Sequence, residues 1–276
     1  MSQLDRPIES QSRKESSSNM RSLDRVAESF YRFFKEGIFT PAIDDISVLT
    51  MEEAYECQRM YQALRFSDGD ESLGYKVGCT SAAIRKQFGF NDPICGCLIS
   101  PGLVHEGTPL KANQYHSLAI EPEFVLTLKR DLLDEDITDD DLLDAIECIQ
   151  PGIELHNYVY HYPQPTRQEL ICSNGIFAGL IVGDSKVRAR DIDWKFEGVT
   201  VLVNGEVVAS GVAADIMGSP LNSLRFLIRH LRESGKVLKA GEMVIPGSAT
   251  ELISVGAGDE VTCSFANAGK ISTSFG

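Results

Sequence analysis

Two glutamates separated by a single residue carry the strongest chemical signal in this sequence. Glu121 and Glu123 flank Pro122, and the apolar segments 118–120 and 124–126 enclose all three. These surroundings predict a buried strand, in which residues i and i+2 point to the same face. Two carboxylates on one buried face repel each other unless a positive group lies between them. A hard divalent cation such as Mg²⁺ or Mn²⁺ suits that place, because it binds several carboxylate oxygens.

A third glutamate extends the pattern. Glu154 lies in the strand-like segment 153–159, directly after Pro151-Gly152-Ile153. Pro122 cannot donate a ladder hydrogen bond, which suggests that the strand with the paired glutamates is a sheet edge or contains a bulge, as strands near active sites often do. The alternative is that the paired glutamates form a solvated face and that Glu154 is unrelated to them.

Three acidic side chains without a histidine form an open site for a hard metal ion. Such a site can hold a 2-oxo acid through its carboxylate and 2-oxo oxygens, and the metal then stabilises the enolate that forms when a proton or carbon dioxide leaves. The reaction also needs a proton shuttle. Lys76 is the candidate, because it lies between Gly74 and Gly78 on a short predicted strand, and a buried lysine near a metal ion can have a lowered pKa. The alternative is an ordinary exposed lysine.

The composition argues against several classes of partner. The formal net charge of −14 over 276 residues disfavours nucleic acid and anionic membranes, which bind basic surfaces. A small anionic substrate stays compatible, because a bound metal ion reverses the local field. No apolar run reaches the roughly 18 residues that span a bilayer. The Ser-rich segment 1–19 has no hydrophobic region, so we expect a disordered tail rather than a secretory signal, and a cytoplasmic protein.

The cysteines and histidines form no recognisable metal or redox motif. Seven cysteines are odd in number and mostly far apart, which is typical of reduced thiols in a cytosolic protein. The close pair Cys95 and Cys97 lacks the second pair that a structural zinc site needs, and the five histidines lack zinc-binding spacing. The sequence also lacks a dinucleotide-binding glycine motif, a Walker A loop and a serine hydrolase elbow. Cysteine–histidine catalysis stays open, with no local motif to support it.

The expected elements give an α+β protein that is β-rich after residue 75. Thr50 and Glu53 form a capping box, and Asn204-Gly205 predicts a hairpin with a type I′ turn. Helices are expected from about residue 22, over 50–66, from 81 to 89, over 138–148 and over 219–235. Strands are expected over 75–78, 117–129, 153–159, 175–182, 199–203 and 207–210, with further short strands at the C-terminus. We divide the chain into a disordered tail over 1–20, a helical N-terminal part over 21–73 and a β-rich catalytic domain over 74–276.

Several short motifs occur together, in the order in which one group of enzymes carries them. They are Glu53-Ala54-Tyr55 with Gln58, the run from Gly74 to Ser81, Ile120-Glu121-Pro122-Glu123, Pro151-Gly152-Ile153-Glu154, Gly218-Ser219-Pro220-Leu221-Asn222, Gly241-Glu242 and Pro246-Gly247. By these motifs the chain resembles the 2-keto-4-pentenoate hydratase and 4-oxalocrotonate decarboxylase group of the fumarylacetoacetate hydrolase-like superfamily. The resemblance covers nearly everything but the tail.

This resemblance implies a fold, a reaction and a set of roles. The fold would be a mixed, strongly twisted β-roll, and the protein would be a homo-oligomer. The reaction would be that of a Mg²⁺- or Mn²⁺-dependent lyase acting on short unsaturated 2-oxo acids in aromatic hydrocarbon catabolism. By motif match, Glu121, Glu123 and Glu154 would bind the metal and Lys76 would be the acid/base. Ser173, in Cys172-Ser173-Asn174-Gly175, matches a family serine near the substrate; the alternative is an ordinary serine at the start of a strand.

The sequence departs from the group's pattern at the positions that concern the substrate. Ile94 stands where hydratases typically carry an aspartate; together with the neighbouring motif residues Thr80 and Ser81, it favours a decarboxylase. After Glu154, His156 lies in place of an Asp-Ser-Arg-like stretch, and it shares the face of that glutamate, as a substrate contact or as a packed histidine. Pro246 replaces a threonine. We assign Ser173, His156 and Thr80 to substrate binding.

Three functions are consistent with these residues. The first is hydration of 2-hydroxypenta-2,4-dienoate, through its tautomer 2-oxopent-4-enoate. The second is decarboxylation of a 4-oxalocrotonate-type 2-oxo acid, and the third is a non-catalytic relative that binds a metabolite or a partner. A pathway enzyme of the same family is a further expected partner. The retained lysine and glutamates favour an enzyme, because a binding protein needs no acid/base.

Overall fold

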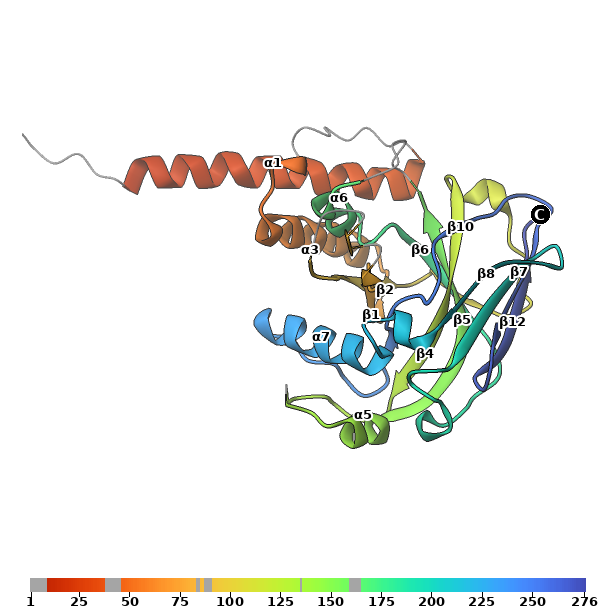
Figure 1. Cartoon of the computed structure of the whole chain (residues 1–276). Helices are drawn as coiled ribbons and strands as arrows, with labels where there is room; N and C mark the ends of the chain where they lie inside the picture. The colour runs from red at the N-terminus through yellow and green to blue at the C-terminus, as the bar shows by residue number, and fades with distance from the viewer. Residues whose placement is uncertain (1–8, 38–45, 83–84, 87–90, 135, 159–164) are drawn as a thin grey trace, which may run out of the picture.

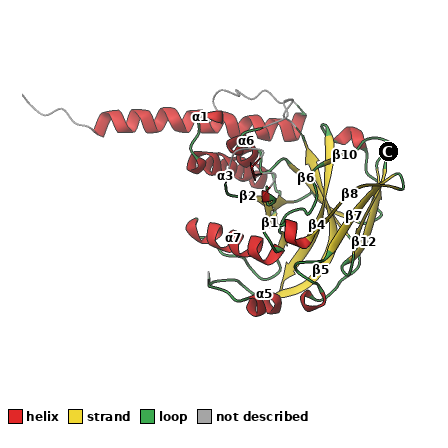
Figure 2. Cartoon of the chain, viewed as in Figure 1, coloured by secondary structure: helices red, strands yellow, loops and turns green. Residues whose placement is uncertain are grey.

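Two β-sheets and a group of helices make up the part of the chain that the structure, a computed structural model, describes. This part comprises residues 9–37, 46–82, 85–86, 91–134, 136–158 and 165–276. The helices are α1 (Glu9–Glu36), α3 (Met51–Ser67), α5 (Asp139–Ala145), α6 (Arg167–Cys172) and α7 (Pro220–Glu233), with 3₁₀ turns η1 (Ala112–Gln114), η2 (Ala189–Asp191) and η3 (Ala213–Asp215). Figures 1 and 2 show α1, α3 and α6 gathered on one side of the molecule and the long strands on the other.

The strands form one large mixed sheet and one smaller antiparallel sheet. They are β1 (Ser72–Gly78), β2 (Ile94–Ile99), β3 (Leu103–His105), β4 (Leu118–Leu128), β5 (Ile146–Asn157), β6 (Phe177–Val182), β7 (Gly198–Val203), β8 (Glu206–Val212), β9 (Met243–Ile245), β10 (Ile253–Ser254), β11 (Glu260–Phe265) and β12 (Gly269–Ser274). The large sheet has the order β2-β1-β9-β4-β5-β6-β3, with β10 also paired to β4, and the small sheet has the order β12-β11-β7-β8. The pairs β1–β9 and β3–β6 are parallel, which makes the large sheet mixed.

The main core lies where β5 contacts β11 and β12 of the small sheet. Its side chains come from both sheets and from α7, and they include Phe124, Ile153, Leu224, Cys263 and Phe275, all at most 1% exposed. The predicted α+β architecture is confirmed.

The N-terminal helices form a second hydrophobic cluster. The predicted apolar face of α1 is buried through Leu23, Val26 and Phe30, and it packs against α3. The capping box of Thr50 and Glu53 is present at the start of α3. The helix expected from about residue 22 is assigned from Glu9, so the tail predicted over 1–20 contains the first turns of α1, while residues 1–8 lie outside the described residues. The division into three parts remains a prediction.

One expected helix is shorter in the structure, because a strand replaces its end. The predicted helix 138–148 ends at Ala145, and β5 starts at Ile146 instead of residue 153. Ile146 pairs with Leu128 and Cys148 with Thr127, so the antiparallel ladder with β4 extends through these residues. The long-range pairing satisfies the backbone of 146–152 and outweighs the local helical pattern.

Other predicted elements agree with the structure. Asn204 and Gly205 both have positive φ, 53° and 82°, as the type I′ turn between β7 and β8 requires. Helix α7 starts at Pro220 after the N-cap Ser219. The helix expected from residue 81 lies largely outside the described residues, which omit 83–84 and 87–90. None of the described helices combines the length and apolar character that crossing a membrane requires.

Candidate active site

Strand alternation and the β4–β5 register place the acidic residues on one face. Glu121 is paired directly with Glu154, and His156 is paired with Ala119. Because opposed residues in an antiparallel pair share a face, Glu121, Glu123, Glu154 and His156 all project to the same side. The register therefore brings Glu154 beside the paired glutamates, although about thirty positions separate them in sequence.

Pro122 lies at a local gap in the pairing of β4. On the side away from β5, strand β4 pairs with β10 at Ile120 and with β9 at Leu126. Pro122 falls between these two pairings, where the described residues offer β4 no ladder partner on that side. Strand β4 is central in the sheet, so the predicted sheet edge exists only locally, and the β4 bulge lies at Thr127/Leu128 instead.

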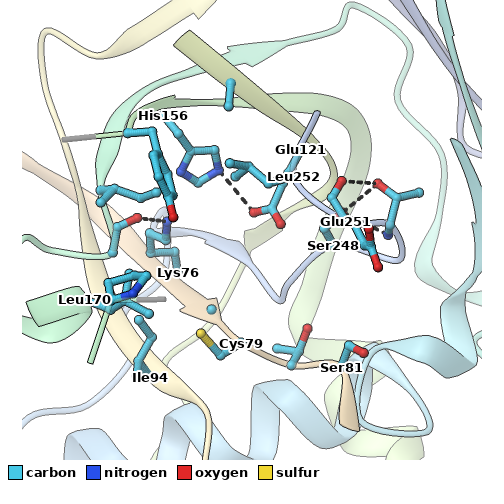
Figure 3. A pocket seen from close by; sticks show the side chains of 18 of the residues that line it. Lys76, Cys79, Ser81, Ile94, Glu121, His156, Leu170, Ser248, Glu251 and Leu252 are labelled. Atoms are coloured by element: carbon cyan, nitrogen blue, oxygen red, sulfur yellow. Dashed lines mark hydrogen bonds and ion pairs between the residues drawn. The ribbon is translucent and has the colours of Figure 1, made fainter. Parts of the chain in front are cut away.

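The common face of these strands borders a cavity of about 360 Å³. Lys76, Thr80, Glu121 and His156 line it, together with apolar side chains that include Ile94 and Leu252. Figure 3 shows Lys76 and His156 at one end of the cavity and Ser248 and Glu251 at the other. The cavity thus has a chemically distinct end at which a base, an imidazole and a carboxylate meet.

Lys76 is buried at this end and has two partners. Its side chain is 3% exposed, and its Nζ forms an ion pair with Glu154 Oε1. Nζ also donates a hydrogen bond to the carbonyl oxygen of Gly175 at 3.1 Å. A buried charge is tolerated only when it is paired and hydrogen-bonded, and Lys76 meets both conditions. Lys76 therefore lies in the cavity wall, and its role as the acid/base remains a prediction.

His156 links the two opposed glutamates. Its Nε2 lies 3.1 Å from Glu121 Oε2 and 3.7 Å from Glu154 Oε2. The other ring nitrogen, Nδ1, is buried without a hydrogen-bond partner among the described residues. A buried polar atom without a partner is uncommon and often indicates that a ligand or an ion completes the site.

Glu123 lies deeper than the other glutamates. It is 1% exposed, and its Oε2 accepts a hydrogen bond of 3.1 Å from the backbone N–H of Gly247. Burial, followed by the nearby charges of Glu154 and Glu121, raises the pKa of Glu123 well above its ordinary value. Ionising all three carboxyl groups of this site is therefore costly, because Lys76 alone does not balance their negative charge.

The donor atoms fit a divalent cation. Three residues, Glu121, Glu154 and His156, each offer one ligand atom, and these three atoms all lie within 4.8 Å of one another. The sequence predicted a site of three glutamates without histidine; in the structure His156 belongs to this group, whereas Glu123 does not. A divalent cation would offset the excess negative charge, and an imidazole ligand suits Mn²⁺ better than Mg²⁺.

The structure separates Ser173 from the other predicted site residues. Thr80 is 3% exposed and lines the main cavity with Lys76 and His156. Ser173 is the C-cap of α6, and its Oγ donates to the carbonyl oxygen of Leu170 at 3.1 Å. It lines a different cavity, of about 20 Å³, beside Phe33 of α1. Ser173 thus lies at the end of a helix rather than at the start of a strand, and its role in substrate binding remains a prediction.

Sequence reasoning missed two elements near the site. Strand β2 is buried at every position and so shows no alternation, and α6 has only six residues. A signal for α6 is present in Thr166 and Glu169, which form a capping box. The turn after α6 also carries an Asn174-Gly175 pair, a common turn signal.

Comparisons with known proteins identify relatives over nearly the whole chain. A 2-keto-4-pentenoate hydratase of Paraburkholderia xenovorans (strain LB400) is 26% identical over 253 residues, which are 91% of this chain and 94% of the relative. A 4-oxalocrotonate decarboxylase of Pseudomonas sp is 29% identical over 252 residues, 91% of this chain and 97% of the relative. The chain is a relative of these lyases. No protein-family model matches the sequence.

A solved structure agrees with these relatives. The 4-oxalocrotonate decarboxylase from Pseudomonas putida G7, complexed with magnesium and adipate, superposes with a TM-score of 0.87 at 25% identity. The match covers 93% of this chain and 98% of that protein. The predicted resemblance and the fumarylacetoacetate hydrolase-like fold, a strongly curled mixed sheet with a few helices, are confirmed.

Proposed function

We propose that the protein is a divalent-metal-dependent lyase that hydrates 2-hydroxypenta-2,4-dienoate, through 2-oxopent-4-enoate. The observation that carries this proposal is the buried ion pair of Lys76 and Glu154. Lys76 lines the cavity together with Glu121 and His156. An acid/base next to a set of oxygen donors is the arrangement that enolate chemistry of a 2-oxo acid needs. The named activities of the relatives support the same class of reaction.

We assign the metal to the acidic face. Glu121, Glu154 and His156 would hold Mg²⁺ or Mn²⁺. Glu123, the third ligand predicted from sequence, lies deeper and outside this donor group. When bound, the cation supplies Lewis-acid stabilisation of the negative charge that develops on the 2-oxo oxygen. The burial of Glu154 and Glu123 excludes water from behind this face and strengthens each electrostatic interaction there.

Lys76 moves the proton in this proposal. Its Nζ is held between Glu154 and the Gly175 carbonyl, and both of these groups accept hydrogen bonds. A lysine fixed in this way can donate a proton to a substrate carbon, or take one from it, at a defined place in the cavity. Thr80 and His156 line the same cavity and would contact the bound substrate.

The charge of the cavity lining favours a monocarboxylic acid over a diacid. Among the described lining residues, the side chains that can carry a positive charge are Lys76 and His156, both at the proposed metal end. Elsewhere the lining contains apolar groups such as Ile94 and Leu252, and an acidic one, Glu251. A second substrate carboxylate would therefore meet no cation among the described lining residues and would lie near the carboxylate of Glu251. This distribution supports the hydratase substrate.

Decarboxylation of a 4-oxalocrotonate-type acid is the second candidate function. Ile94, at the start of β2, is 2% exposed and lines the cavity where hydratases of the group carry an aspartate. An apolar wall at this point lacks the group that would manage an attacking water. The fold comparison with the decarboxylase from Pseudomonas putida G7 supports the same alternative. A non-catalytic, metabolite-binding relative is the third candidate.

A single assay separates the three candidates. Purified protein is supplied with Mg²⁺ or Mn²⁺ and with either 2-hydroxypenta-2,4-dienoate or 4-oxalocrotonate, and both ultraviolet absorbance and carbon dioxide are recorded. We expect loss of the dienoate absorbance without carbon dioxide. Release of carbon dioxide from 4-oxalocrotonate alone would establish the decarboxylase instead. If both substrates stay unchanged with either metal, the two named activities are wrong.

We further propose a cytoplasmic homo-oligomer that works beside a pathway enzyme of the same family. Seven cysteines without a disulfide support a reducing compartment. Strand β8 lies at the end of the small sheet, and it exposes Val207 and Val208 to 64% and 50%. Exposed apolar side chains on a terminal strand are typical of a surface that another chain covers.

A further inference from the structure

The turn between α6 and β6 has an unusual backbone. Three consecutive residues, Asn174, Gly175 and Ile176, have positive φ angles of 56°, 65° and 52°. Glycine adopts this region freely and asparagine tolerates it, but a β-branched residue such as Ile176 does so only under constraint. Contacts outside the turn must therefore hold its conformation.

The side chain of Asn174 supplies those contacts. Its Oδ1 accepts a hydrogen bond from the backbone N–H of Cys97 at 2.8 Å, and its Nδ2 donates to the carbonyl oxygen of the same residue at 2.8 Å. Gln62 of α3 donates a further bond to Oδ1 at 3.2 Å. Asn174 is 1% exposed, so its amide takes the place of a strand partner on β2 and fastens the turn to that strand.

The turn formed by Asn174, Gly175 and Ile176 also contacts Lys76. The carbonyl oxygen of Gly175 accepts the hydrogen bond from Lys76 Nζ at 3.1 Å. A Cβ atom at Gly175 would lie 3.1 Å from both Cε and Nζ of Lys76, and a Cβ atom at Gly96 of β2 would lie 3.0 Å from its Cγ. The lysine side chain therefore runs through a slot between two residues that have no Cβ atom.

We propose that Asn174 is a positioning residue for Lys76. By binding the backbone of Cys97, it fixes the left-handed turn, and the turn presents the Gly175 carbonyl that orients Nζ toward Glu154. Gly96 and Gly175 form the walls of the slot. The catalytic consequence rests on the proposed function, in which Lys76 moves the proton; the positioning of the side chain does not depend on it.

Two substitutions and a control test this arrangement. Asn174→Gly removes the amide but keeps a residue that adopts positive φ without strain. Gly96→Ala keeps the Asn174 amide but adds a methyl group 3.0 Å from Lys76 Cγ and 3.2 Å from both the carbonyl oxygen and Oδ1 of Asn174, at a position whose φ is not left-handed, so it presses on the slot from the side of β2. Gly198→Ala is the matched control, because Gly198 also lies in a strand, has no left-handed φ, and no atom lies within 4 Å of its added Cβ.

Two measurements read the result. In the metal-free protein, acetic anhydride labelling followed by peptide mass spectrometry compares Lys76 with the exposed Lys270 of the same molecule. We expect the relative labelling of Lys76 to rise several-fold in Asn174→Gly and Gly96→Ala, and to stay unchanged in Gly198→Ala. In the metal-loaded enzyme, we expect kcat to fall on the order of 10- to 100-fold in the first two variants, with a smaller change in KM.

The outcomes separate this proposal from the proposed function. Folded Asn174→Gly and Gly96→Ala proteins with wild-type labelling of Lys76 would overturn the positioning role. Increased labelling with an unchanged kcat would show that the lysine's orientation does not serve the reaction, and would overturn the catalytic part. If the wild type turns over no 2-oxo acid, the proposed function fails while the labelling still decides the positioning. If circular dichroism shows Asn174→Gly unfolded, Gly96→Ala decides.

Discussion

Lys76 and Glu154 form a buried ion pair at the proposed active site. Each is almost fully buried, and each is the counter-ion of the other. Removing one leaves the other as an unpaired buried charge, which is strongly destabilising. Substitutions at this pair therefore need two readouts, one for the reaction and one for the fold.

The first prediction concerns Lys76 itself. Lys76→Met keeps the length of the side chain and removes the proton donor, so we expect kcat to fall about 10²- to 10⁴-fold, the usual range for a general acid/base. Metal affinity should persist, because the carboxylates and the imidazole remain. Kinetics and Mn²⁺ titration measure the two effects, circular dichroism checks the fold, and the exposed Lys270→Met is the control. Full activity in Lys76→Met would remove the lysine from the mechanism.

The second prediction concerns the metal donors. A ligand that binds only the folded state raises stability by about 2.7 kcal/mol at a hundred times its Kd. We therefore expect Mn²⁺ to raise the Tm of the wild type, and Glu121→Gln to reduce that shift. Glu251→Gln is the control, because Glu251 lines the cavity outside the donor group. Equal Tm shifts in wild type and Glu121→Gln would argue against the metal site.

Glu123 gives a third prediction, which depends on pH. Its raised pKa means that the folded, metal-free protein holds a proton which the unfolded chain releases near the ordinary value of 4.5. Stability should therefore fall as pH rises from that value through the raised pKa. Glu123→Gln cannot ionise, so it should lose this decline and be the more stable protein at neutral pH. Urea unfolding of both metal-free proteins across pH 4 to 8 is the measurement; parallel curves would contradict the prediction.

At the scale of elements, the site depends on how strands and turns are joined. The alternation in β4 was predictable from local sequence, because a buried strand with two glutamates at i and i+2 has one orientation for both. Strand β2 was not predictable, since a uniformly buried strand has no period. Helix α6 was marked only by its capping box, since six residues show little helical period. These two elements hold the Asn174 turn, so the slot around Lys76 was invisible in the sequence.

The contact between α3 and α7 gives a prediction at this scale. His230 of α7 packs on Tyr55 of α3, with ring centroids 4.5 Å apart, and burial lowers its pKa below the ordinary 6.5. The unfolded chain therefore takes up a proton as pH falls below 6.5 while the folded protein does not, and stability decreases there. His230→Phe should weaken this loss between pH 6.5 and 5. The same slope in variant and wild type, measured by urea unfolding, would contradict it.

At the scale of the whole molecule, the cavity is assembled from distant parts of the chain. Lys76 comes from β1, the donor group from β4 and β5, and the opposite end from the segment that contains Glu251. Only the packing of these parts decides which charges the substrate meets. The result is one end that combines Lys76 and His156 with the glutamates, and an apolar to acidic remainder.

The fifth prediction alters that distribution of charge. Leu252→Arg places a cation in the part of the lining that has none among the described residues. We expect the ratio of kcat/KM for a 2-oxo diacid to that for a 2-oxo monoacid to rise several-fold, because a second carboxylate then gains a partner. Leu252→Gln changes polarity without charge and is the control. An unchanged ratio in Leu252→Arg would show that the distal carboxylate does not reach this wall.

The sequence by itself determined the features that depend on neighbours along the chain. The shared face of Glu121 and Glu123, the capping box of α3 and the type I′ turn at Asn204-Gly205 follow from backbone periods and local hydrogen bonding. The order of the motifs also indicated the group of enzymes to which the relatives belong.

The tertiary structure alone decided which residues meet across long separations. Register placed Glu154 opposite Glu121 and brought His156 into the donor group, and sheet order placed Lys76 against Glu154. The same packing left Ser173 in a separate cavity. A strand's period fixes its face but not its partner, because pairing depends on the burial and hydrogen bonding of the whole sheet.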